Sequence, residues 1–183
     1  MPMRLAPMRA EDRDRVSELL TATDVFSDEE IGVALELCDI GLGEAACRPA
    51  PGEGPAPAIA DLDYEFVGAY DDAGQLTGYA CFGPTPATDG TYDLYWLAVD
   101  PSAQGQGTGR ALVRWVEQQL AARGARLLVV ETSSRADYAH TRQFYVRSGS
   151  AETATVHDFY APGDDRIILT TRLTTRQGGV ATR

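Results

Sequence analysis

Residues 99–113, VDPSAQGQGTGRALV, place three glycines on alternate positions, at 105, 107 and 109. An apolar run, LYWLAV, leads into them, and an amphipathic run, ALVRWVEQQLAARG, follows. A backbone that wraps around an anion needs residues without Cβ. The first turn of a helix offers unpaired amides at the positive end of its dipole. The stretch therefore predicts a strand, a glycine-rich turn and a helix that together cradle a phosphate.

Two common phosphate-binding sequence motifs do not match this stretch. The P-loop pattern fails because Gly109 is followed by Arg110 rather than by lysine. The dinucleotide pattern GxGxxG fails because its last glycine would fall on position 110 as well. A nucleotide-binding domain is therefore disfavoured. The pattern that does fit is Q-x-x-G-x-G, formed by Gln104, Gly107 and Gly109.

The length, composition and net charge of the chain limit the classes of protein to which it can belong. It has 183 residues, 44% of them hydrophobic, which suits one globular domain. A net charge of −11 argues against a nucleic-acid binder and is compatible with a cationic partner. No apolar run is long enough to span a membrane, and the charged N-terminus does not resemble a signal peptide. Three cysteines without a CxxC and two histidines predict reduced thiols, a cytoplasmic location and no metal.

The order of the elements predicts an α+β fold. Antiparallel strands, including a hairpin turned by DDAGQ, pass into a strand–helix–strand crossover at the glycines. A capping box of Ser27 and Glu30 predicts the start of the second helix, and RLLVVE predicts a strand buried on both faces. We expect one domain over 1–175, with an exposed Pro/Gly-rich loop at 48–60 and a disordered tail at 176–183.

The whole combination resembles the GNAT superfamily of N-acetyltransferases. Its members share the strand, the VxP, the QxxGxG, the amphipathic helix, the buried strand and a later helix with FY, and the likeness extends from about residue 3 to 173. The resemblance implies an α/β sheet that is mixed and mostly antiparallel, with an acyl-CoA cleft between the LYWLAV and RLLVVE strands. It also implies acetyl-CoA as co-substrate and no metal. The implied cofactor contacts are Leu97, Ala98, Val99, Gln104, Gly105, Gln106, Gly107, Thr108, Gly109 and Arg110.

Acetyl transfer to an amine needs a base, a donor for the oxyanion and an acid for the leaving thiolate. The resemblance implies Tyr145 as the acid, with a core aromatic as the alternative, and a backbone amide near Leu97 or Val99 at the oxyanion. Glu131 ends an apolar strand, where burial would raise a carboxyl pKa, so it is a candidate base. It resembles the base of bacterial ribosomal-protein N-terminal acetyltransferases, although its loop to Tyr145 is slightly longer. Alternatively, Glu131 only ends the strand or anchors that loop.

Asp93 and a water molecule compete with Glu131 for the role of base. Strand alternation predicts that Asp93 shares a face with Tyr95, Leu97 and Val99, and a solvated residue at the end of the strand is the favoured alternative role for Asp93. Tyr160 lies where related enzymes bind the acceptor, and packing on an edge strand is its alternative role. The resemblance implies a primary amine as acceptor, either a small molecule or a protein N-terminus, and a monomer or homodimer. A non-catalytic acyl-CoA sensor is the alternative function.

Overall fold

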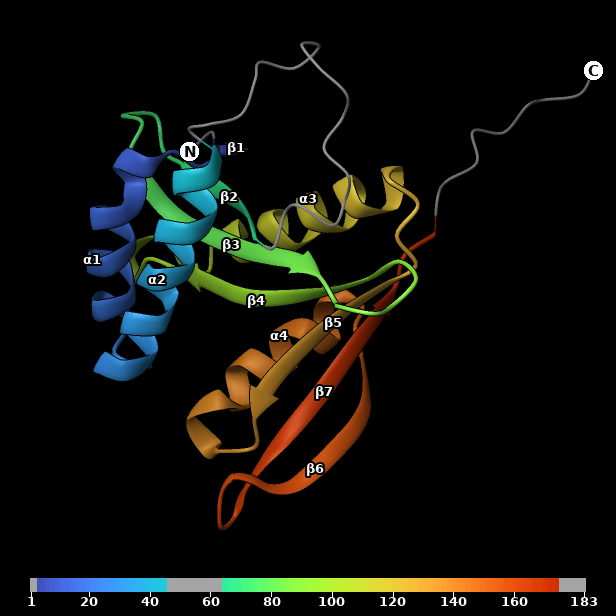
Figure 1. Ribbon diagram of the computed structural model, residues 1–183. Coiled ribbons are helices and arrows are strands. Elements are labelled where there is room, and N and C mark those ends of the chain that lie inside the picture. The colour runs from blue at the N-terminus through green and yellow to red at the C-terminus, as the bar shows by residue number, and fades with distance from the viewer. Residues whose placement is uncertain (1–2, 46–63, 175–183) are drawn as a thin grey trace, which may run out of the picture.

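The computed structural model describes residues 3–45 and 64–174, which form a seven-stranded sheet with helices on both faces (Figure 1). Neighbouring strands are antiparallel except β4 and β5, so the expected mixed, mostly antiparallel sheet is confirmed. The expected loop at 48–60 and tail at 176–183 lie outside the described residues. In sheet order the strands are β1 (Arg4–Pro7), β2 (Glu65–Tyr70), β3 (Leu76–Pro84), β4 (Thr91–Val99), β5 (Leu127–Ser133), β7 (Asp164–Arg172) and β6 (Ala151–Ala161).

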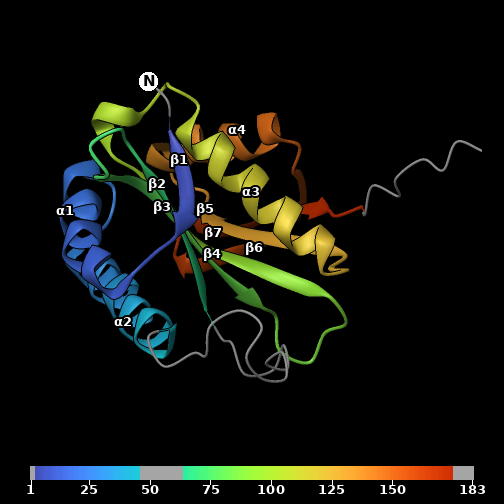
Figure 2. The same cartoon turned by 90° about the horizontal axis from the view of Figure 1, so that it is seen from above.

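Two helices lie on each side of the sheet (Figure 2). They are α1 (Arg13–Thr23) and α2 (Asp28–Ala45) on one face, and α3 (Thr108–Ala122) and α4 (Ala139–Ser148) on the other. The α1/α2 core includes Val16, Leu20, Cys38 and Tyr79. The α3/α4 core includes Leu112, Val116, Leu128, Val130 and Tyr145. None of the four helices, as far as the described residues show them, is long and apolar enough to cross a membrane.

The start of α2 has the predicted capping box. The Glu30 amide donates to Ser27 Oγ over 3.3 Å, and the Ser27 amide donates to Glu30 Oε2 over 2.8 Å. Each side chain thus satisfies an amide that helix geometry leaves without a partner. The same turn holds Asp28 and Glu29, so three carboxylates gather at this helix end.

The sheet splits between β4 and β5. The two strands pair from Thr91 and Leu127 as far as Leu94 and Val130. Beyond that point β4 continues to Val99 beside β3 alone, and β5 continues beside β7 alone. The splayed cleft expected between these strands is therefore present, and one edge of β4 is left without a strand partner.

A β-bulge in β4 changes which residues share a face. Cys81 pairs with Trp96 and Phe82 pairs with Leu94, so Tyr95 is an extra residue in the ladder. Leu94 lies in the α3/α4 core, and Leu97 packs against that same core. The predicted simple alternation was wrong, because an inserted residue reverses the side-chain phase of a strand. Asp93 therefore faces away from the α3/α4 core, opposite to Leu97.

Strand β5 is buried on one face only, which corrects the expectation for RLLVVE. Leu128 and Val130 are buried in the α3/α4 core, whereas Val129 is half-buried and Glu131 is exposed. Helices α1 and α2 pack on β2, β3 and β4, and Figure 1 shows them to one side of β5 and β7. The second face of β5 is consequently left open beside the split.

Candidate active site

The turn between β4 and α3 has two glycines whose backbone conformation favours glycine. Gly105 and Gly107 have φ values of 72° and 87°. No atom lies within 4 Å of a Cβ built at either position, so backbone conformation favours glycine there, not lack of space. At Gly109 a Cβ would lie 3.4 Å from the Phe144 ring. That distance is an ordinary contact, so neither space nor backbone conformation requires glycine at position 109.

The first cavity lies between this turn, the free edge of β4 and helix α4. Its volume is about 670 Å³. Most of the cofactor contacts implied by the sequence line it: Leu97, Val99, Gln104, Gly105, Gly107, Thr108, Gly109 and Arg110. A strand edge and a helix N-terminus thus open into one space that is large enough for an elongated ligand.

Two of the expected contacts do not line this cavity. Ala98 is buried in the α1/α2 core, because it points to the opposite face of β4. Gln106 is turned back along the chain, where its Nε2 donates to the carbonyl of Ser102 over 2.9 Å. Its side chain holds the turn together, and it is not on the cavity wall.

Helix α4 supplies a wall that the sequence analysis missed. The residues are His140, Thr141, Gln143, Phe144, Arg147 and Ser148. Most of them recur at helical spacing on one face, a signal that could have identified the wall. Arg147 joins Arg110 there, and the described residues on the wall include no carboxylate. The first cavity is therefore suited to an anionic ligand.

The second cavity opens on the other face of the sheet, beside the split. It measures about 330 Å³. It brings together Asp93, Glu131 and Tyr160, which the sequence analysis had singled out separately. Leu94, Tyr95, Val129 and Arg166 complete its wall. Strands β4, β5, β6 and β7 all contribute, so the cavity depends on the tertiary fold.

Glu131 is ion-paired and is not in an apolar setting. Its carboxylate accepts a hydrogen bond from Arg166 of the neighbouring strand β7, and the two side chains are 35% and 27% exposed. The Arg166 guanidinium lies over the ring of Phe159, 4.7 Å from its centre. The expected apolar surroundings of Glu131 were wrong, because the open face of β5 lies against a charged residue of β7.

Asp93 and Tyr160 occupy distinct positions in the same cavity. Asp93 accepts a hydrogen bond from Thr85 Oγ1 over 2.7 Å, which fixes its carboxylate. Burial raises the pKa of Tyr160, and the charges of Asp164 and Glu30 raise it further. Tyr160 is still 49% exposed. It therefore stands at the mouth of the cavity with its hydroxyl protonated.

A wide bulge in the β6–β7 hairpin carries Tyr160 to this mouth. Val156 pairs with Arg166 and Ala161 pairs with Asp164, which leaves residues 157–160 outside the ladder. Asp158 has a φ of 52°, in the left-handed region that residues other than glycine seldom adopt. Such bulges redirect side chains near functional sites.

Tyr145 is buried in the α3/α4 core, the cluster that also holds Leu94 and Val130. These two residues are the last pair that joins β4 to β5. Tyr145 is buried and lines neither cavity, whereas its neighbour Phe144 lines the first one. Burial raises its pKa, so the phenol stays protonated across the neutral range.

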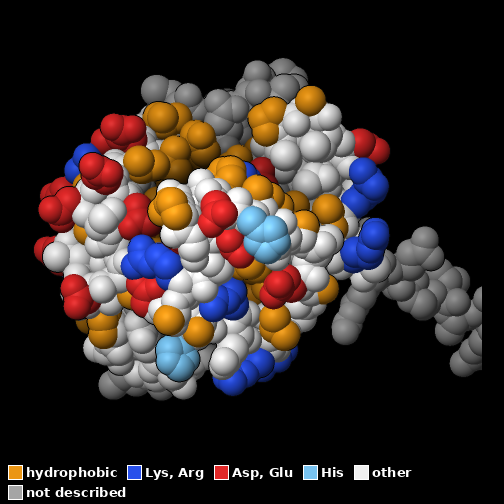
Figure 3. All heavy atoms as spheres, turned by 90° about the horizontal axis from the view of Figure 1, so that it is seen from below, with side chains coloured by type: hydrophobic (Ala, Val, Ile, Leu, Met, Phe, Trp, Pro, Cys, Tyr) orange, Lys and Arg blue, Asp and Glu red, His pale blue; other side chains and the backbone are white. Residues whose placement is uncertain are grey.

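Acidic side chains gather on one side of the molecule, and one of them acts on the second cavity. Figure 3 shows acidic side chains gathered on the side of the molecule formed by α1 and α2. Glu30 at the start of α2 is close enough to raise the pKa of Tyr160 at the cavity mouth. In the described ranges, no group of three or more His, Cys, Asp or Glu residues is placed to hold a metal ion.

Similar structures share this architecture. A GNAT-family protein from Desulfovibrio desulfuricans is 40% identical, with 94% of this chain and 100% of that chain covered and a TM-score of 0.82. The ribosomal-protein-S18-alanine N-acetyltransferase of Escherichia coli is 19% identical over 100% and 99% of the two chains, with a TM-score of 0.67. The yncA protein of Salmonella typhimurium, solved with its cofactor acetyl-CoA, is 17% identical over 100% of both chains, with a TM-score of 0.68.

Sequence comparison gives the same family. No curated protein matches the chain. The sequence model of the acetyltransferase (GNAT) family matches residues 42–149, which include β2 to β5, the glycine turn and all of α3 and α4. This match and the similarity to the Desulfovibrio protein both show that the chain belongs to the GNAT acetyltransferase family.

Proposed function

We propose that this chain transfers an acetyl group from acetyl-CoA to a primary amine. The observation that carries the proposal is the pair of cavities at the split. One lies on the α3/α4 face and is suited to an anion, and the other lies on the opposite face and holds two carboxylates. Two substrates that bind from opposite faces would meet where β4 and β5 separate. The yncA structure with acetyl-CoA supports the choice of cofactor.

The first cavity has the features that coenzyme A requires. The turn amides from Gln104 to Arg110 would bind the pyrophosphate, with Arg110 and Arg147 adding positive charge. The edge of β4 near Leu97 and Val99 has no partner in β5. It would pair with the pantetheine amides in the manner of an added strand. Acetyl-CoA supplies the reactive thioester at the end of that arm.

The second cavity suits an amine. Its wall carries the carboxylates of Asp93 and Glu131 and one guanidinium, that of Arg166, so one negative charge is left over. A primary ammonium ion would balance that charge. The acceptor would be a small amine or a protein N-terminus, and the similarity to the S18-alanine enzyme supports the second option.

Two side chains of this protein would move the protons. Glu131 would take a proton from the bound ammonium, directly or through water, to give the nucleophilic amine. Tyr145 would donate its phenolic proton to the leaving sulfur, since burial keeps that phenol protonated. A backbone amide near Leu97 or Val99 would stabilise the oxyanion. Asp93 is the alternative base, because it lines the same cavity.

The deciding experiment measures thiol release from acetyl-CoA with a panel of acceptors. The panel contains amino acids, polyamines, aminoglycosides, arylamines and N-terminal peptides, beside a blank without acceptor. All 16 basic residues of the chain are arginine, so no lysine of its own can act as an internal acceptor. We expect release with at least one amine and acetyl-CoA binding by calorimetry. Binding without release from any acceptor would favour the acyl-CoA sensor, and absence of binding would refute the proposal.

A further inference from the structure

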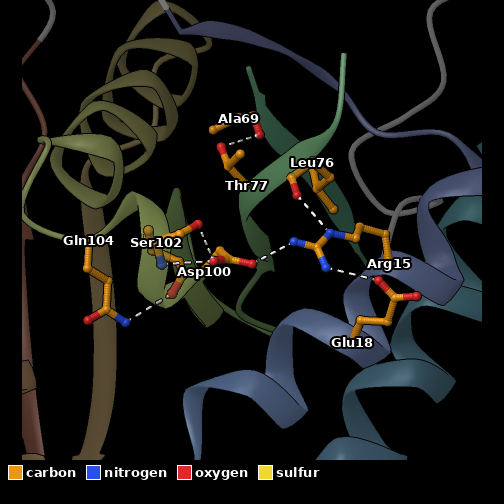
Figure 4. A network of polar contacts seen from close by, with 9 residues as sticks. Arg15, Glu18, Ala69, Leu76, Thr77, Asp100, Ser102 and Gln104 are labelled. Carbon is orange, nitrogen blue, oxygen red and sulfur yellow. Dashed lines mark hydrogen bonds and ion pairs between the residues drawn. The ribbon is translucent and has the colours of Figure 1, made fainter. Parts of the chain in front are cut away.

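A network of polar contacts joins helix α1 to the end of β4 (Figure 4). Arg15 Nη2 donates to Asp100 Oδ2 over 2.5 Å, and Arg15 Nε donates to the carbonyl of Leu76 over 3.1 Å. Arg15 Nη1 donates to Glu18 over 2.9 Å, which orients the guanidinium within its own helix. The Arg15 and Asp100 side chains are only 24% and 13% exposed, so solvent screens this ion pair weakly.

The same Asp100 carboxylate begins the glycine turn. Its Oδ1 accepts from the Ser102 amide over 2.9 Å and from Ser102 Oγ over 2.6 Å. These bonds lower the pKa of Asp100, and Arg15 lowers it further, so the group is anionic. Farther along, Thr108 Oγ1 donates to the carbonyl of Ala103 over 3.2 Å. A continuous series of contacts therefore runs from α1 to the N-terminus of α3.

The position of Asp100 raises an electrostatic problem that Arg15 solves. A carboxylate at the base of a turn that binds phosphates would repel the ligand. The Arg15 guanidinium, which Glu18 also contacts, offsets part of this negative charge from the α1 side and leaves Oδ1 free to hold Ser102. Arg15 does not line the first cavity, so any effect on the ligand passes through Asp100.

We propose that Arg15 is a positioning residue for the phosphate-binding turn. It holds Asp100 in the geometry that aims the turn amides at the pyrophosphate, and it offsets part of the charge of that carboxylate. The inference rests on the proposed use of coenzyme A. It assigns to α1, a helix outside the first cavity, a specific part in cofactor affinity.

The test compares coenzyme A with a ligand that has only its pantetheine arm. Calorimetry measures the Kd of coenzyme A and of pantetheine, which lacks the pyrophosphate and the 3′-phosphoadenosine attached to it, for the wild type and for Arg15→Gln. We expect Arg15→Gln to weaken coenzyme A binding about tenfold, the order of one hydrogen bond to a charged group, and to leave pantetheine binding unchanged. Equal weakening of both ligands, or of neither, would overturn the inference. If the wild type bound no coenzyme A, the proposed function itself would fail.

The chain offers a matched control on the same helix. Arg13 pairs with Asp39 of α2, with Nη2 and Oδ2 2.8 Å apart, and this pair is exposed and remote from the turn. Arg13→Gln therefore also removes one ion pair of α1, but we expect it to leave both Kd values unchanged. Thermal unfolding of each variant shows whether α1 stays folded.

A double variant separates the two parts of the proposal. Asp100→Asn keeps an oxygen that can accept from Ser102 and removes the negative charge. We therefore expect Arg15→Gln with Asp100→Asn to bind coenzyme A more tightly than Arg15→Gln alone, because no uncompensated carboxylate remains. Purely additive losses would contradict the role of charge neutralisation.

Discussion

The two cavities at the split are built from different parts of the chain. The first is made largely by backbone, with two glycines at positive φ, the N-terminus of α3 and the free edge of β4. The second is made by side chains from four strands, in which Asp93, Glu131 and Arg166 place opposite charges close together. A site formed by backbone groups binds features that many ligands share, such as a phosphate or an amide. A site formed by side chains distinguishes one ligand from another.

This difference suggests how the proposed activity is divided. The first cavity would fix the cofactor, and its surrounding residues can vary as long as the turn is kept. The second would fix the acceptor through charge and shape. Tyr145 belongs to neither wall, since it is buried in the α3/α4 core. Variants of the three regions should therefore separate chemistry, cofactor affinity and acceptor choice.

The largest effect is expected at Tyr145. Tyr145→Phe removes the proposed acid and keeps the ring, so turnover should fall about 1000-fold, within the range for a positioned proton donor, with acetyl-CoA affinity intact. Thiol release and calorimetry measure the two quantities. Tyr70→Phe is a control, because Tyr70 is also a buried tyrosine and donates to Asp12 over 2.6 Å away from either cavity. Unchanged turnover in Tyr145→Phe would exclude the acid role.

The next effect separates the two candidate bases. Glu131→Gln should lower kcat/KM about 100-fold and remove the acidic limb of the pH profile, as loss of a general base does. Asp93→Asn keeps the acceptor for Thr85 and should lower kcat/KM only a few-fold. The reverse order would assign the base to Asp93. Small effects in both variants would indicate that a water molecule accepts the proton.

A smaller effect is expected in the glycine turn. Gly107→Ala forces a side chain into the left-handed region, which costs about 1 kcal/mol of stability and displaces the turn amides. We expect the Kd of coenzyme A to rise about tenfold, as for one lost bond to a phosphate. Gly74→Ala is the matched control, because Gly74 has a φ of 79° and equal space in the remote β2–β3 turn. It should lose the same stability and no affinity. Equal affinity in both variants would contradict the phosphate site.

The sequence was informative wherever structure depends on neighbours along the chain. The capping box at Ser27, the hairpin, the glycine turn and the order of helices and strands along the chain follow from local patterns, and the structure confirms them. The phase of β4 does not follow from such patterns. It is set by the bulge at Tyr95, which only the pairing with β3 specifies. A rule of alternation therefore placed Asp93 on the wrong face.

The parts of the site that escaped prediction depend on contacts distant in sequence. The α4 wall lines the first cavity because the fold packs Phe144 of α4 beside Gly109 of α3. Glu131 meets Arg166 because β7 inserts beside β5, although 35 positions separate the two residues. The residues that make these contacts do not stand out in the sequence. The surroundings of these residues are determined by the pairing of the strands. The sequence therefore identified single residues of the second cavity but did not predict that they form one site.

The smallest effect tests whether charge in the second cavity selects the acceptor. Arg166→Gln removes the guanidinium and raises the net negative charge on the wall from one to two. One added negative charge on the cavity wall, close to the bound acceptor, should favour a diamine over a monoamine by about fivefold in relative kcat/KM at low salt. The ratio is the measurement, because any general loss through Glu131 acts on both acceptors and cancels. Rising salt should shrink the difference. A ratio that does not move would show that shape, set by Tyr95 and Tyr160, selects the acceptor and that the charges serve only the chemistry.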